Sequence, residues 1–109
     1  MQFSQIFYAH LEHDEQGNDV YVDIYPDRCA TEMFGKEEVI TIVVTECKPE
    51  ETSKYWAWLK FRDKRPYRYV WHEKYKTMDC IKNWKQKEAE GAGKLVNVKI
   101  RKWKGWNLG

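Results

Sequence analysis

Cations and aromatic rings are concentrated together in residues 54–75. Seven aromatic side chains lie from Tyr55 to Trp71, and six Lys or Arg side chains lie from Lys60 to Lys74. Flat rings stack on nucleobases at about 1–3 kcal/mol per base, while Lys and Arg neutralise phosphates. This combination is typical of a surface that binds single-stranded nucleic acid.

The segment has two distinct faces if it forms a β-hairpin. Its polar stretch, residues 62–66, predicts the turn, because Pro66 cannot lie inside a strand ladder. A turn centred on Lys64 separates apolar from charged side chains, which favours this register. The resulting apolar face, which we assign to the core, pairs Ala57 with Trp71, Leu59 with Tyr69, and Phe61 with Tyr67.

The opposite face of the hairpin holds candidate binding residues. It pairs Trp56 with His72, Trp58 with Val70, and Lys60 with Arg68, and it places Arg62 beside the turn. Like charges opposite each other destabilise a sheet. We therefore expect either a bound anion or a neighbouring acidic side chain between Lys60 and Arg68.

The C-terminal segment, residues 99–106, repeats this combination of rings and cations. A nucleic-acid surface built from both segments comprises Trp56, Trp58, Lys60, Arg62, Arg68, His72, Lys99, Arg101, Lys102, Trp103 and Lys104. Two other interpretations stay open. A helix or the C-terminal tail can cover Trp56 and Trp58, with Lys stems lying over the rings. Alternatively, the same types of side chain can anchor a protein partner.

Charge is divided unequally along the chain, although the overall net charge is only +2. Residues 1–53 carry three Lys or Arg against twelve Asp or Glu, a net charge of −9, whereas residues 54–109 carry sixteen against five, a net charge of +11. Such a difference predicts either a partner for one half or pairing between the halves inside the fold. It also supports an alternative function as a protein-interaction or inhibitor module, including a homo-oligomer.

A short acidic pattern resembles the signature of a nuclease family. Pro26 and Asp27 are followed by an apolar strand that ends in Glu46, Cys47 and Lys48, which is similar to the PD-(D/E)xK motif of metal-dependent nucleases. The resemblance covers this stretch alone. It implies two carboxylates that hold a divalent cation and a Lys that activates or orients water.

The expected strand pairing separates the two carboxylates of this motif. Asp27 follows the end of one strand and Glu46 ends the next, so an antiparallel hairpin places them at opposite extremes. A turn near residues 32 and 33 places Asp19 opposite Glu46, beside Lys48 but without the preceding Pro. The nuclease is therefore kept as the second alternative, and the main prediction is a non-enzymatic binding module.

Other catalytic or cofactor chemistry lacks a motif in this sequence. There is no Ser-His-Asp set, glycine-rich phosphate loop or zinc motif, and we predict no catalytic residue, cofactor or metal site. His10 and His13 fall on opposite faces of their strand, which disfavours a shared metal. Because Cys29, Cys47 and Cys80 are odd in number and contain no CxxC pair, free thiols in a reducing compartment are expected.

Length and hydropathy predict one domain, residues 1–109, in the cytoplasm. No apolar run reaches the roughly 18 residues of a membrane span, and the first residues lack the features of a signal peptide. We accordingly expect nucleic acid or protein as partners, and neither a membrane nor an evident small-molecule substrate.

Periodicity predicts an α+β fold in the order β-β-β-β-β-α-β. The expected strands cover residues 3–11, 20–25, 38–47, the two arms of the hairpin, and 94–103, and one helix covers residues 78–90. Thr77 is expected to cap the helix, and Gly91 and Gly93 to end it. Short connections favour a mainly antiparallel, twisted sheet of five to six strands, a number that also allows a partly closed barrel.

Overall fold

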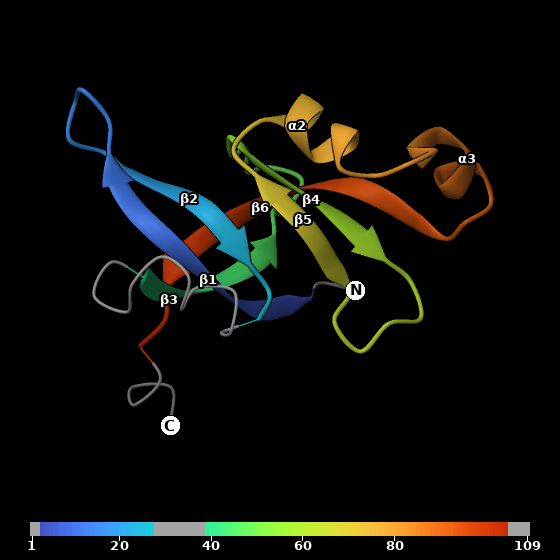
Figure 1. Cartoon of the computed structure of the whole chain (residues 1–109), viewed down its shortest axis with the longest axis horizontal. Helices are drawn as coiled ribbons and strands as arrows, with labels where there is room; N and C mark the ends of the chain where they lie inside the picture. The colour runs from blue at the N-terminus through green and yellow to red at the C-terminus, as the bar shows by residue number, and fades with distance from the viewer. Residues whose placement is uncertain (1–2, 28–38, 105–109) are drawn as a thin grey trace.

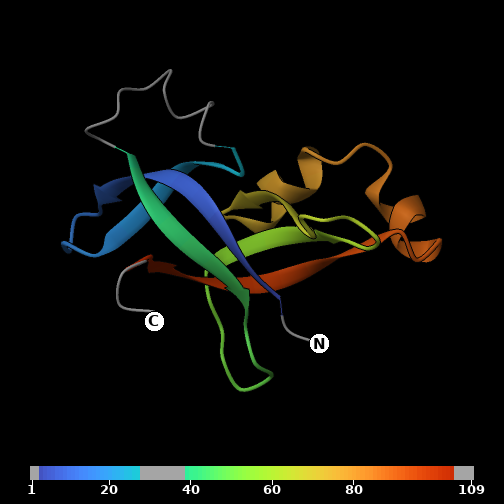
Figure 2. The ribbon, with the colours of Figure 1, turned by 90° about the horizontal axis from the view of Figure 1, so that it is seen from below.

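The computed structural model describes residues 3–27 and 39–104. Their helices and strands are β1 Ser4–His13, β2 Asp19–Tyr25, β3 Val39–Glu46, β4 Tyr55–Lys60, β5 Tyr67–Trp71, α2 Lys74–Asp79, α3 Trp84–Ala89 and β6 Gly93–Lys102. The strands form one antiparallel sheet in the order β2-β1-β3-β6-β4-β5. The sheet curls until its edge strands, β2 and β5, contact each other, so the fold is a nearly closed barrel (Figures 1 and 2). This arrangement confirms the predicted sheet.

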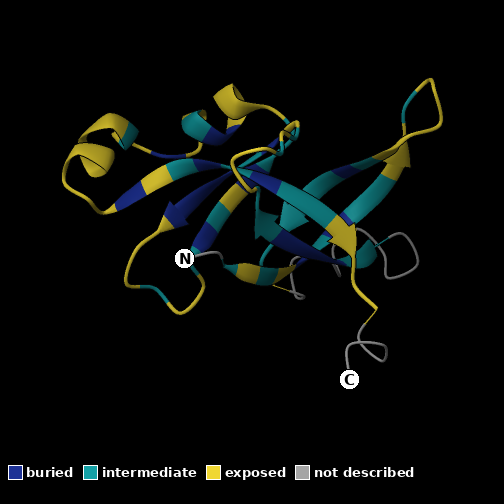
Figure 3. Ribbon diagram, turned by 180° about the vertical axis from the view of Figure 1, so that it is seen from behind, coloured by how far each residue is buried: buried dark blue, intermediate teal, exposed yellow. Residues whose placement is uncertain are grey.

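Alternating apolar residues fill the inside of the barrel, as Figure 3 shows for the buried parts of the strands. On β6, Val96 and Val98 are buried and Ile100 packs against the same cluster, which confirms the alternation expected from the sequence. The remaining buried members of the cluster are Phe7, Ala9, Tyr21, Ile42, Val44, Tyr55, Ala57, Leu59, Tyr67 and Val70.

Buried tyrosine hydroxyls in this core bind backbone groups. The Tyr67 hydroxyl accepts a hydrogen bond from the Glu46 N–H (2.9 Å) and donates one to the Phe3 carbonyl (2.7 Å). Burial raises the pKa of Tyr67 to about 12. The Tyr55 hydroxyl accepts from the Tyr21 N–H at 2.7 Å. These bonds tie β1, β2 and β3 to the β4–β5 hairpin and satisfy polar atoms that would otherwise be buried without partners.

The predicted register of the β4–β5 hairpin is wrong. The observed pairs are Trp56 with Trp71, Trp58 with Arg68, and Leu59 with Tyr67. The register shifts at a bulge between the Trp56–Trp71 and Trp58–Arg68 pairs, where Tyr69 has a φ of 51°. A bulge places two residues opposite one and changes which later side chains face inward.

The bulge exchanges the expected environments of several side chains. Val70 is buried in the core, whereas Tyr69, which was assigned to the core, is 51% exposed. Phe61, also assigned to the core, lies beyond the end of β4 and is 39% exposed. Lys60 does not lie opposite Arg68, because Arg68 pairs with Trp58.

The other edge strand has a similar irregularity. Between the Tyr8–Tyr25 and His10–Val22 pairs the register of β1 and β2 shifts, and Asp23 has a φ of 48°. Tyr21 is buried in the core, and Ile24, three residues later, packs against the edge of the same cluster. In addition, β1 lies between β2 and β3, so the expected pairing of the second and third strands is wrong.

The single helix expected over residues 78–90 is two short helices in the structure. Asn83 adopts a left-handed conformation with a φ of 57°, which interrupts the helix before α3. Thr77 lies inside α2 rather than at its N-cap, and its buried hydroxyl donates to the Trp56 carbonyl at 3.1 Å. Gly91, with a φ of 73°, ends α3 as expected, whereas Gly93 belongs to β6.

Candidate nucleic-acid interface

Trp58 cannot stack on a nucleobase, because it is only 3% exposed. It points to the outside of the barrel, where the connection between α2 and α3 covers it and contributes buried Ile81. The backbone of Gly93 also lies against the indole. A Cβ atom at position 93 would come within 2.5 Å of Trp58 Cζ2. The interpretation in which helices cover this ring is therefore correct for Trp58.

A groove lies over this buried ring, between the outer face of the β4–β5 hairpin and the helical segment. Its volume is about 620 Å³, within the range of roughly 300–1,000 Å³ that is usual for ligand sites. The residues lining this groove, which we call the basic groove, are Trp58, Lys60, Arg68, Tyr69, Cys80, Ile81, Lys82, Lys87, Glu90 and Ala92.

Positive charge predominates in the basic groove. Four cationic side chains line it, against the single carboxylate of Glu90, whose Oε1 accepts a hydrogen bond from Gln86 at 3.0 Å. Within residues 3–27 and 39–104, no carboxylate forms an ion pair with Lys82 or Lys87. Their ammonium groups are thus available to an anionic ligand.

The acidic side chain expected between Lys60 and Arg68 is Asp63. Its Oδ2 lies 2.8 Å from Arg68 Nη2 and 3.6 Å from Lys60 Nζ. The hydrogen bond from Arg68 and one from the Arg65 N–H lower the pKa of Asp63 to about 2. Asp63 is therefore ionised at neutral pH and neutralises part of the charge of Lys60 and Arg68 at one end of the groove.

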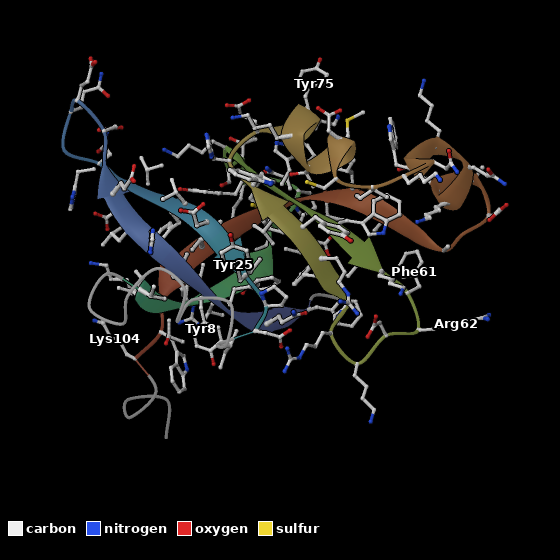
Figure 4. All side chains as sticks on the ribbon, viewed as in Figure 1. Tyr8, Tyr25, Phe61, Arg62, Tyr75 and Lys104 are labelled. Atoms are coloured by element: carbon white, nitrogen blue, oxygen red, sulfur yellow. The ribbon has the colours of Figure 1, made fainter. Side chains whose placement is uncertain are left out.

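Exposed rings are present at the groove, but they are not the predicted tryptophans. Tyr69 lines the groove, and the backbone N–H of Phe61 donates to the carbonyl of Ala92, a lining residue, at 3.1 Å. Figure 4 shows Phe61 at the end of β4, with Arg62 beyond it in the following loop. The exposed rings at the groove are therefore Tyr69 and Phe61, and Trp58, which was expected to be exposed there, is buried.

Trp56 and His72 lie outside the basic groove. The Trp56 ring is partly buried, and Lys74 Nζ lies over it, 4.7 Å from its centre, in a cation–π contact. His72 Nε2 lies 3.4 Å from Glu73 Oε1. Arg62 is exposed beyond β4 and does not line the groove.

The predicted residues of β6 form a separate surface. Lys99 lies 3.0 Å from Glu51, and Lys102 lies 3.7 Å from Asp19, so acidic residues of the N-terminal half neutralise both. Arg101, Trp103 and Lys104 are exposed on the same segment. Lys104 and Phe61 lie at opposite sides of the molecule in Figure 4. Trp106 lies outside the described residues.

The structure therefore brings together only part of the predicted site. Trp58, Lys60 and Arg68 meet in the basic groove, while the residues of β6 do not join them. Lys82 and Lys87, which line the groove, were not among the candidate residues chosen from the sequence. Their positive charge was visible in the sequence, but their distance from the hairpin depends on how the helical segment folds back.

The acidic residues of the nuclease-like pattern are also separated. Asp19, on β2, lies 3.1 Å from His13. Glu46 lies at the end of β3, and β1 separates β2 from β3 in the sheet. Asp27 pairs instead with Arg65. In the described parts of the chain, no three His, Cys, Asp or Glu side chains are grouped so that they could hold a metal ion.

Two of the three cysteines fall in the described residues. Cys47 and Cys80 are free thiols there, and Cys29 lies outside these residues. Burial raises the pKa of the Cys47 thiol, which disfavours the reactive thiolate. Among the helices that the structure describes, none is both long and apolar enough to cross a membrane.

No known protein family model matches the chain, and no curated protein or solved structure is significantly similar to it.

Proposed function

We propose that this protein is a non-enzymatic module that binds single-stranded nucleic acid in the basic groove. The composition of the groove lining supports this proposal. Four cationic side chains and an exposed tyrosine ring line the groove, with a single carboxylate among them. A phosphate backbone supplies the repeated negative charge that such a lining attracts.

The exposed ring favours a single strand over a duplex. Tyr69 is half-exposed at the groove, where it can stack on a base. Bases of a duplex are already stacked on one another, whereas those of a single strand present free faces to aromatic side chains. Phe61 offers a second exposed ring at the neighbouring end of β4.

Titration of labelled single-stranded DNA, single-stranded RNA and duplex DNA, followed by fluorescence anisotropy, tests this proposal. Three or four phosphates bound to cations predict that log K falls with log salt concentration with a slope of about −2 to −3, at roughly 0.7 per phosphate of a single strand. We expect the single strands to bind more tightly than the duplex. Absence of binding even at low salt, where non-specific attraction is strongest, would rule the proposal out.

A second candidate function is self-association through the outer face of β1, β3 and β6. Ile6 pairs with Val43, which pairs with Arg101, so these side chains share one face of the sheet. Ile6 is 39% exposed and Trp103, two residues beyond Arg101, is 40% exposed. Exposed apolar side chains on one face favour a protein contact. Light scattering over a range of protein concentrations distinguishes a dimer from a monomer.

A further inference from the structure

A second cavity lies at the seam of the barrel, where β2 and β5 contact each other without being hydrogen-bonded neighbours in the sheet. Its volume is about 290 Å³. The residues lining this cavity, which we call the seam cavity, are Asp23, Ile24, Tyr25, Pro26, Arg68, Tyr69, Val70, Trp71 and Cys80.

The two bulges explain why the seam stays open. Asp23 on β2 and Tyr69 on β5 both have positive φ and both line the cavity. A bulge bends its strand and interrupts the regular row of backbone donors and acceptors. The edges of the sheet therefore meet through side chains at this point rather than through a continuous ladder.

The lining of the seam cavity suits a flat ring. Three aromatic residues, Tyr25, Tyr69 and Trp71, line it together with the aliphatic Ile24 and Val70. Aromatic side chains stack on planar heterocycles. A volume near the lower end of the usual range for ligand sites fits one such ring better than a larger molecule.

The seam cavity adjoins the basic groove. Arg68, Tyr69 and Cys80 line both.

We infer that the seam cavity receives one base of the nucleic-acid strand whose phosphates lie in the basic groove. The base stacks against the aromatic side chains of the cavity. This inference rests on the proposed function, because the strand in the groove brings the base to the seam. The affinity of the strand then depends on a contact with the base in addition to contacts with its phosphates.

Two ligands and two matched variants test the inference. The ligands are a short oligothymidylate and an abasic oligonucleotide of the same length, which has the phosphates without the bases. The variants are Tyr25→Ala, which removes a ring of the seam cavity, and Tyr75→Ala, which removes a 75% exposed ring of α2 outside both cavities. Figure 4 shows these two tyrosines well apart.

We expect Tyr25→Ala to weaken oligothymidylate binding about tenfold, within the range for loss of one stacked base, and to leave binding of the abasic strand unchanged. Tyr75→Ala should change neither. Equal losses for both ligands, or no loss for either, would overturn the inference. If the unmutated protein binds both ligands equally, only the base contact fails. If it binds neither at low salt, the proposed function fails as well.

A second pair of variants keeps the test valid if Tyr25→Ala unfolds the protein, which circular dichroism would show. Cys80 is exposed and lies where the basic groove meets the seam cavity. Cys80→Leu should narrow this junction and weaken oligothymidylate binding about tenfold, as for loss of one stacked base, without changing abasic-strand binding, whereas the smaller change Cys80→Ser should change neither. Unchanged preference for oligothymidylate in Cys80→Leu would contradict a base in the cavity.

Discussion

The basic groove and the C-terminal part of β6 contain the same types of side chain, yet their charges are neutralised to different extents. In β6, Glu51 and Asp19 lie beside Lys99 and Lys102. In the groove, Asp63 neutralises part of the charge at one end, and Lys82 and Lys87 have no ion-pair partner among the described residues.

The difference follows from the positions of the acidic segments. The connection from β3 to β4, which contains Glu51, projects from one end of the barrel, and the helical segment lies elsewhere (Figure 2). Asp19, at the start of β2, lies 3.7 Å from Lys102 of β6. Charges interact strongly only within about 8 Å at physiological salt. Among the described acidic residues of the N-terminal half, Glu51 and Asp19 pair with Lys99 and Lys102, and none pairs with Lys82 or Lys87.

The largest predicted effect is a loss of stability on replacement of Gly93, which lies beneath the basic groove. In Gly93→Ala the new Cβ would lie 2.5 Å and 2.6 Å from two atoms of the Trp58 ring. We expect the free energy of unfolding to fall by about 3 kcal/mol, since buried overpacking costs roughly 1–3 kcal/mol. Urea denaturation followed by circular dichroism measures this loss.

Gly17→Ala is the control for this substitution. A Cβ atom at position 17 would have no other atom within 4 Å, but Gly17 has a φ of 81°, so its replacement introduces backbone strain without a clash. We expect a smaller loss of about 1 kcal/mol. Equal losses in the two variants would show that the contact between Gly93 and Trp58 does not support the floor of the groove.

The next largest predicted effect is a difference in single-strand affinity between variants of the two basic surfaces. The double variants Lys82→Gln/Lys87→Gln and Lys99→Gln/Lys102→Gln each remove two positive charges, so they have the same net charge. We expect the first to weaken single-strand binding on the order of 30-fold and the second by about threefold or less, because only the first pair lacks acidic partners. Fluorescence anisotropy at one fixed salt concentration measures both.

Equal losses in the two double variants would mean that net charge, rather than the groove, determines binding. A greater loss in the Lys99→Gln/Lys102→Gln variant would instead move the interface to β6. The salt dependence gives an independent measurement. If two phosphate contacts are lost, the slope of log K against log salt concentration should become shallower by about 1.4 in Lys82→Gln/Lys87→Gln alone, which would support binding in the groove.

The smallest effect should come from Asp63, the acidic side chain at the end of the groove. Asp63→Asn removes a negative charge beside Lys60 and Arg68, so we expect about threefold tighter binding of single strands. Asp79→Asn, a change of the same charge on exposed α2, should have less effect. A decrease in affinity in Asp63→Asn would show that Asp63 acts mainly by positioning Arg68.

The pH dependence of this contribution follows from the lowered pKa. With a pKa of about 2, compared with 3.8 for an ordinary Asp, the Asp63 carboxylate favours the folded protein above pH 3.8, and this contribution is lost as the pH falls through about 2. Between pH 5 and 8 Asp63 stays ionised. The ratio of affinities of the variant and the unmutated protein should therefore be constant over that range.

Much of the sheet and the general chemistry of the candidate site could be predicted from the sequence by itself. The alternation of Val96, Val98 and Ile100 placed β6 correctly, because burial on one face of a strand selects every second residue. Gly91 marked the end of the helical segment, since its left-handed conformation favours glycine. The composition of residues 54–75 and the unequal division of charge indicated where rings and cations would be found.

Only the tertiary structure decided which rings are exposed and which cations are unpaired. Trp58 is buried because the connection between α2 and α3 covers it on the outer face of the barrel. Tyr69 is exposed at a bulge whose positive φ no local sequence signal predicts at a tyrosine. Lys99 and Lys82 look alike in the sequence, but only Lys99 has Glu51 beside it. The physical reason is the same in both cases: exposure and neutralisation depend on contacts between segments far apart in the chain, which exist only once the sheet has curled.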